Sequence, residues 1–117
     1  MKTDRELLEL AAKAMGMTGW RYSGAVSGML QMIDPSRPDD TGSVGPNWNP
    51  LADDGDALRL AVALGLQVIP GTYKNDEASV YRAGICEVHE YVSFQQDMAA
   101  ATRRAIVRAA AEIGANK

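Results

Sequence analysis

The spacing of apolar residues near the start of the chain is that of a helix. Leucine and alanine recur on one helix face between Leu7 and Met15, and Thr3 with Glu6 forms a capping-box pattern in front of them. Gly16 supplies a natural C-terminal stop. The pattern therefore predicts a first helix between Thr3 and Gly16.

Two further segments show the same periodicity. In the first segment, the aspartates at positions 53, 54 and 56 precede an apolar run that ends at Gly65. Carboxylates in the first turn of a helix accept hydrogen bonds from its free amide groups, so this segment predicts a second helix. The longest helical pattern extends from Asp97 to Ile113, with Arg104 and Arg108 opposite its apolar stripe. We therefore expect three helices.

The segments between the helices have the pattern of strands. One of these segments, Leu66–Tyr73, contains Pro70, which has no backbone N–H to donate to a neighbouring strand. This strand is therefore expected at the edge of a sheet or at a bulge. The residues of Trp20–Asp34 predict two short strands or a hairpin. Further strands are expected at Leu66–Tyr73, Ala78–Ala83 and Ile85–Val92.

A turn-rich segment separates the first strands from the second helix. Prolines and glycines with Ser, Asp and Asn fill Asp34–Pro50, which predicts a long loop of the kind that often has a function. Helices and short-linked strands in this order predict an α+β fold built on a largely antiparallel sheet between helices, in α/β/α layers. Residues 1–117 are expected to form a single domain.

Composition narrows the classes of function. The chain has 117 residues, a length typical of one domain. Its residues are 46% hydrophobic and 23% charged, which is the composition of an ordinary globular protein. Its net charge of −3 argues against non-specific binding to duplex nucleic acid, which needs a basic surface. The only cysteine, Cys86, cannot form an intrachain disulfide, which favours a reducing cytoplasm. No apolar run reaches the roughly 18 to 20 residues of a membrane span.

Residues that could carry catalysis or bind a metal are few. His89 is the only imidazole, and no nucleophile or acid stands at a diagnostic spacing from it, so a strand position is the favoured interpretation. Helix capping explains the aspartates at 53–56 better than a Ca²⁺ loop does. We expect no enzyme, no cofactor and no metal site.

Side chains must hold any bound phosphate, because the chain has no Walker motif and no dinucleotide fingerprint. Guanidinium groups match phosphate oxygens, and aromatic rings stack on bases. A solvated helix face, with an Arg108–Glu112 pair, and ordinary core packing of the aromatics are the alternatives. The candidate ligand-binding residues are Arg59, Arg103, Arg104, Arg108, Trp20, Tyr22, Trp48 and Tyr81.

Three stretches resemble a known family. They are RELLELAAKAMG (5–16), NWNPLADDGDALRLAVALG (47–65) and ATRRAIVRAAAEIG (101–114). In this order they resemble the phage ABA sandwich domain family, small proteins of phages and prophages. Thoeris anti-defence proteins look similar in size and layout. The resemblance implies an antiparallel sheet between helices and a sponge that binds a host nucleotide signal without cleaving it.

The resemblance also implies a site and a setting. Arg59 and Arg104 would contact phosphates, Trp20 or Tyr81 would stack on adenine, and Asp97 would lie near the base or ribose. The signal would be a cyclic ADP-ribose isomer or a cyclic oligonucleotide, captured in the host bacterial cytoplasm by a homo-oligomer, a dimer or a hexamer.

Two other functions remain open from the sequence. A protein-binding module would use the segment Asp34–Pro50 and exposed aromatics such as Trp48. A nucleotide hydrolase would need His89 or the aspartates around Asp53 in a cleft with a metal.

Overall fold

Three helices are present in the computed structural model, which describes residues 2–16, 20–23, 29–33, 44–71, 76–91 and 97–117. They are α1 (Asp4–Ala14), α2 (Asp54–Leu64) and α3 (Met98–Ala115). The residue before each helix accepts a hydrogen bond from a backbone N–H of the first turn, so all three predicted helix starts are confirmed. α2 ends at Gly65, whose φ of 65° is readily adopted by glycine.

Within the described ranges, six strands form two antiparallel sheets. β1 (Trp20–Ser23), β2 (Met29–Ile33) and β3 (Val44–Trp48) make the first sheet, in that order. β4 (Gln67–Ile69), β5 (Glu77–Arg82) and β6 (Cys86–Tyr91) make the second. The expected hairpin after Trp20 is confirmed by the pairing of β1 with β2. β4 stops before Pro70 and lies at a sheet edge, as its proline predicted.

The prediction that the whole of 34–50 is loop is wrong at its C-terminal end. Residues 44–48 form β3, which pairs with β2 from Leu30↔Trp48 to Ile33↔Val44. Pro46 is tolerated because β3 is an edge strand and the ladder shifts register opposite it. Residues 34–43 of the expected loop lie outside the described residues.

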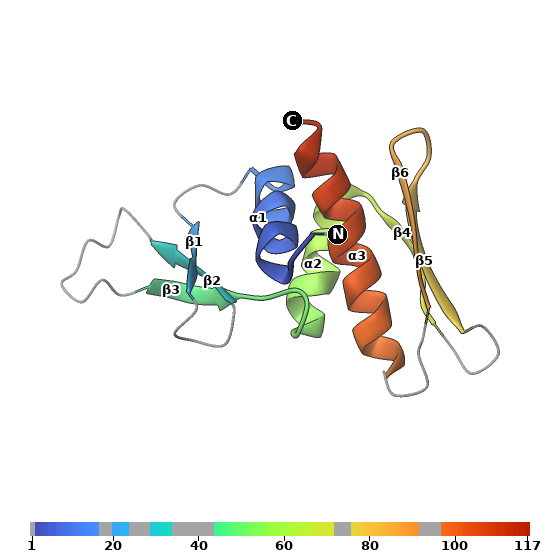
Figure 1. Cartoon of the computed structure of the whole chain (residues 1–117), viewed down its shortest axis with the longest axis horizontal. Coiled ribbons are helices and arrows are strands. Elements are labelled where there is room, and N and C mark those ends of the chain that lie inside the picture. Colours follow the sequence, from blue (N-terminus) through green and yellow to red (C-terminus); the bar gives the residue numbers. More distant parts are fainter. Residues whose placement is uncertain (1, 17–19, 24–28, 34–43, 72–75, 92–96) are drawn as a thin grey trace.

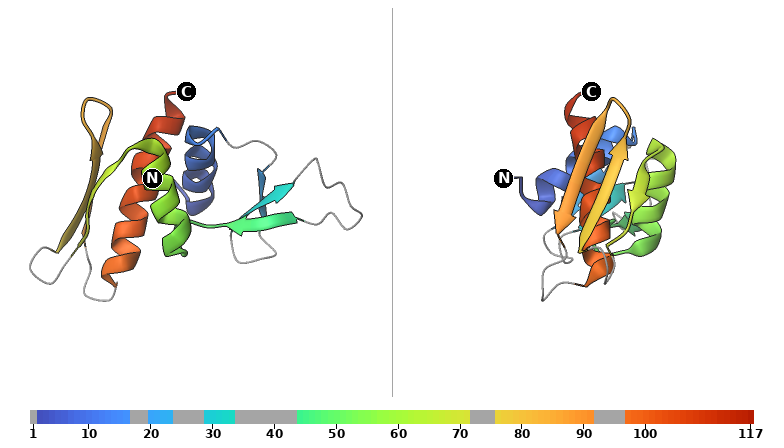
Figure 2. Two further views of the ribbon diagram at one scale, coloured as in Figure 1. Left: turned by 180° about the vertical axis from the view of Figure 1, so that it is seen from behind. Right: turned by 90° about the vertical axis from the view of Figure 1, so that its right-hand side faces the viewer.

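The helices lie between the two sheets, with α3 central (Figure 1). The side view shows β4, β5 and β6 lying across α3 (Figure 2). Buried residues such as Val80 of β5 and Val88 of β6 alternate with half-buried residues in β5 and with exposed or half-buried residues in β6, so this sheet packs one face on the helix. The prediction of an α+β fold with antiparallel strands is confirmed. The layers differ from the expected sheet between helices: the strands form two separate sheets, β1–β3 and β4–β6, and the helices lie between them (Figure 1).

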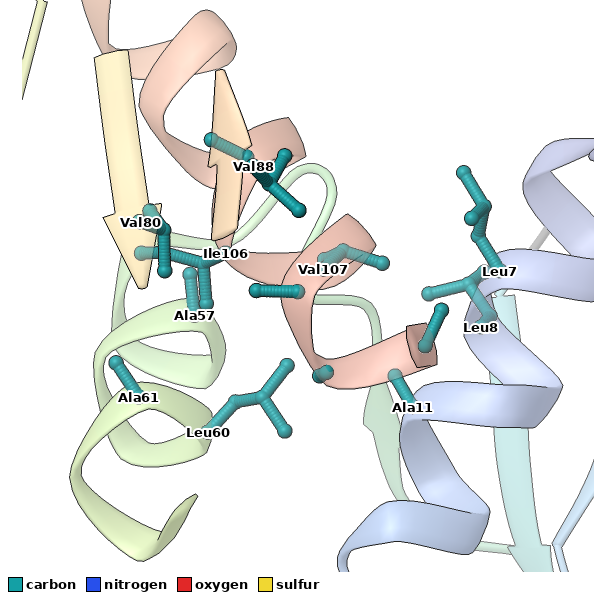
Figure 3. Packing of buried hydrophobic residues seen from close by; sticks show 14 of the residues in the cluster. Leu7, Leu8, Ala11, Ala57, Leu60, Ala61, Val80, Val88, Ile106 and Val107 are labelled. Carbon is teal, nitrogen blue, oxygen red and sulfur yellow. The ribbon is translucent and has the colours of Figure 1, made fainter. Parts of the chain in front are cut away.

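The core extends across both sides of α3. Ile106 lies toward Val80 of the sheet, and Val107 lies toward α1 (Figure 3). α3 approaches α1 closely at Gly114, where a Cβ atom would overlap the backbone carbonyl of Leu10. Small residues therefore set how closely these helices pack.

No helix in the described part of the chain combines the length and the apolar character needed to cross a membrane.

The thiol of Cys86 is buried at the start of β6, and its burial raises its pKa above the ordinary value. The thiolate is the reactive form, so both effects slow alkylation. We expect iodoacetamide at pH 8 to modify the native protein at least about tenfold more slowly than the protein unfolded in urea. Mass spectrometry of quenched samples measures both rates; equal rates would contradict the buried position.

Candidate functional site

Two of the predicted arginines, Arg104 and Arg108, lie one helical turn apart on α3. Residues separated by four positions project from the same side of a helix. Both side chains are half-buried, with Arg104 30% and Arg108 41% exposed. They therefore form a pair of cationic groups at the junction of α3, β6 and the start of α1.

Glu90 of β6 is the main partner of this pair. Its Oε2 accepts a hydrogen bond from Arg108 Nη1 at 2.6 Å, and its Oε1 lies 4.0 Å from Arg104 Nε. Arg108 Nη1 also donates to the carbonyl oxygen of His89 at 3.0 Å. Arg108 thus pairs with β6. The Arg108–Glu112 pair, which belonged to the alternative of a solvated helix face, is not among the contacts of the described residues.

Arg104 connects α3 to the N-terminus of α1. Its Nη1 donates to Asp4 Oδ1 at 3.0 Å. Asp4 is mostly exposed, so this ion pair is screened by water and contributes little to folding.

A cavity of about 320 Å³ opens beside these arginines. It brings together residues of α1, β6 and α3 with the N-terminal segment. Three of the lining side chains are cationic and two are anionic, so the lining is locally positive on a protein whose net charge is −3. The lining residues are Lys2, Leu7, Glu90, Arg104, Arg108, Ala111 and Glu112.

The structure places Arg103 on another side of α3. Its Nε donates to the carbonyl oxygen of Leu51 at 2.9 Å, and its Nη1 contacts Asp54 Oδ1 at 2.6 Å. The side chain is only 17% exposed. Arg103 thus ties α3 to the start of α2, and it borders a mainly apolar groove of about 350 Å³ formed by α2, β4 and α3.

Arg59 does not line the cavity of Arg104 and Arg108. Its side chain is 71% exposed and contacts Asp56 Oδ1 at 2.7 Å within α2. Asp56 is itself buried, and its other oxygen accepts a hydrogen bond from the backbone N–H of Asn49. The described chain therefore gives Arg59 a local partner and does not bring it to Arg104.

Among the predicted aromatic residues whose side chains are described, neither Trp48 nor Tyr81 lines the cavity of Arg104 and Arg108. Trp48 is 7% exposed and belongs to the core, as the alternative interpretation had it. Tyr81 lines a separate cavity at the turn between β5 and β6. Trp20 is in β1, and its side chain, like that of Tyr22, lies outside the described part of the structure. Asp97 caps α3 by accepting from Ala100 N.

His89 lies on the open face of the second sheet in a polar cluster. Its Nδ1 is 2.7 Å from Glu77 Oε1 and 3.0 Å from Ser79 Oγ. A nucleophile triad needs the hydroxyl and a hydrogen-bonded carboxylate on opposite ring nitrogens. Here Ser79 and Glu77 share Nδ1, and Glu87 Oε1 lies 3.8 Å from Nε2, which is too far for a hydrogen bond. Within the described residues, no group of three or more His, Cys, Asp or Glu side chains is arranged to hold a metal ion.

Sequence reasoning named Arg104 and Arg108 as ligand-binding residues and missed the other three charged residues of the cavity, Lys2, Glu90 and Glu112. The signal for Glu90 was its position in β6, on the same face as the buried Cys86 and Val88. A carboxylate on an otherwise apolar strand face requires a polar or cationic partner nearby. Lys2 carries no comparable signal, because it precedes the first helix.

Comparison with known proteins adds no relative to this picture: no family model, no curated protein and no solved structure matches the chain.

Proposed function

We propose that this protein is a non-enzymatic sponge that binds a small anionic, nucleotide-derived signal in the cavity of Lys2, Arg104 and Arg108 and releases it chemically unchanged. The observation that carries the proposal is the convergence of these three cationic side chains on one cavity. Its volume of about 320 Å³ lies at the lower end of the range of small-molecule sites.

The two guanidinium groups suit a diphosphate. Each presents a planar fork of N–H donors that matches two phosphate oxygens. Side chains one turn apart on α3 can hold adjacent phosphates, and Lys2 adds a point charge at the rim. Capture of this kind relies on charge and hydrogen bonds, and requires no acid–base pair.

The resemblance to phage ABA sandwich proteins supplies the biological setting of the proposal. The ligand is a host immune signal such as a cyclic ADP-ribose isomer, which contains a diphosphate, or a cyclic oligonucleotide. By binding it in the bacterial cytoplasm, a phage or prophage protein would inhibit anti-phage defence. A homo-oligomer would add residues of a second subunit around the open side of the cavity.

Retention of an intact ligand tests this function. The purified protein is incubated with a cyclic ADP-ribose isomer or a cyclic dinucleotide, desalted and heat-denatured, and the released small molecules are identified by mass spectrometry. We expect at least one probe to be retained near stoichiometry and recovered unchanged.

Two results would contradict the sponge. A cleaved product would indicate an enzyme. Failure to retain any probe would favour the second candidate, a protein-binding module. The supporting observation for that candidate is the mainly apolar groove of α2, β4 and α3, which is lined by Leu58, a leucine that is 64% exposed.

A further inference from the structure

Glu90 stands between the two arginines of the proposed site. Its two carboxylate oxygens face different guanidinium groups, at 2.6 Å from Arg108 Nη1 and 4.0 Å from Arg104 Nε. A phosphate group bound by both arginines would place its oxygens in the same positions. An anionic ligand would therefore compete with the Glu90 carboxylate for Arg108 Nη1, which donates to it, and for the nearby guanidinium of Arg104.

The position of Glu90 is set by the sheet. Glu90 pairs with Ala78 in the β5–β6 ladder, so its backbone is held by a neighbouring strand. Its side chain is 20% exposed, compared with 63% for Asp4, the other carboxylate that contacts Arg104. Asp4 lies nearer to Arg104, at 3.0 Å, but water screens its exposed carboxylate; Glu90 is screened less and is the carboxylate that faces both arginines.

We propose that Glu90 is the specificity-determining residue of this site: it competes with the ligand for Arg104 and Arg108 and selects for anions with at least two negative charges. The inference rests on the proposed function. A monocarboxylate has the same charge and the same number of acceptor oxygens as the Glu90 side chain, so the arginines gain nothing by exchanging one for the other. The free monocarboxylate also loses translational and rotational entropy on binding. A diphosphate offers more oxygens and more charge than one carboxylate, so it displaces Glu90 or draws the arginines away from it.

The substitution Glu90→Gln separates competition from a purely structural role. Glutamine keeps the size of the side chain but removes its charge. We expect Glu90→Gln to bind inorganic pyrophosphate about fivefold more tightly than the wild type, as removal of one competing ion pair predicts. The same variant is expected to unfold at a slightly lower temperature, whereas a purely structural residue would lose both stability and affinity.

Glu112→Gln is the matched control, because Glu112 lines the same cavity but is exposed and, within the described part of the chain, forms no ion pair with either arginine. Isothermal titration calorimetry with pyrophosphate and with acetate compares the proteins. We expect a gain of less than about twofold for Glu112→Gln and no measurable acetate binding to the wild type. If Glu90→Gln does not fold, Glu90→Asp keeps the charge but shortens its reach, and a smaller gain in affinity is expected.

The possible failures are distinguishable. Equal pyrophosphate affinity in wild type and Glu90→Gln, or equal gains in Glu90→Gln and Glu112→Gln, would overturn the role of Glu90 and leave the sponge intact. Tight binding of acetate by the wild type would also overturn it. Absence of pyrophosphate binding in every variant would overturn the proposed anion site itself, and the role of Glu90 with it.

Discussion

Replacement of Gly114 by alanine is expected to lower the free energy of unfolding by about 3 kcal/mol, or roughly 10 °C in Tm. A Cβ atom at this position would overlap the carbonyl of Leu10 and lie 3.3 Å from the backbone nitrogen of Ala14. Both obstacles are main-chain atoms of α1, so no side-chain rotation relieves the overlap. The helices must separate, and the core between them loses contacts. Thermal unfolding followed by circular dichroism measures the change.

Gly55→Ala is the matched control for this substitution. Gly55 is also helical, and a Cβ atom there would lie 3.2 Å from the end of the Arg59 side chain, which can rotate away. It would also lie 3.2 Å from Oδ2 of Asp53, the oxygen that caps α2, and a shift of a few tenths of an ångström relieves this contact without breaking the cap. Alanine also has the higher helix propensity. We expect Gly55→Ala to leave Tm unchanged or to raise it slightly. A Gly114→Ala protein as stable as the wild type would show that α1 and α3 are not packed this closely.

The helices could be predicted because their signals are local. Asp53 accepts from Asp56 N and Asp97 accepts from Ala100 N, in both cases across three residues. Such a cap depends on few neighbours, so a short stretch of sequence contains it completely. The apolar stripe of α3 can likewise be recognised in the sequence. The sequence does not show, however, that α3 packs on two sides, against the second sheet and against α1.

The strand β3 could not be predicted from its own residues. Gly45 and Pro46 are typical of turns, and only pairing with β2 makes the segment extended. The partners of the arginines are non-local in the same way. Glu90 is 18 residues from Arg108, and Asp4 is 100 residues from Arg104. Sequence could name the cationic residues of α3, but only the fold shows which carboxylates they face.

Loss of both cavity arginines is expected to abolish ligand capture. Each charge-assisted hydrogen bond to a phosphate contributes about 1.5 kcal/mol or more, so Arg104→Gln with Arg108→Gln should weaken pyrophosphate binding at least about 100-fold. The fold should tolerate the change, because the ion pairs lost are partly exposed and each contributes at most about 1 kcal/mol. Calorimetric titration measures the affinity, and circular dichroism confirms folding.

Arg5→Gln with Arg59→Gln provides the control for net charge. This double variant removes the same two positive charges from the exposed surfaces of α1 and α2, where Arg5 pairs with Glu9 and Arg59 pairs with Asp56. If pyrophosphate binds at the cavity, the control keeps its affinity within about threefold, because exposed charges at a distance are screened by salt. Equal losses in the two double variants would mean that the anion responds to overall charge, and the cavity of Arg104 and Arg108 would no longer explain binding.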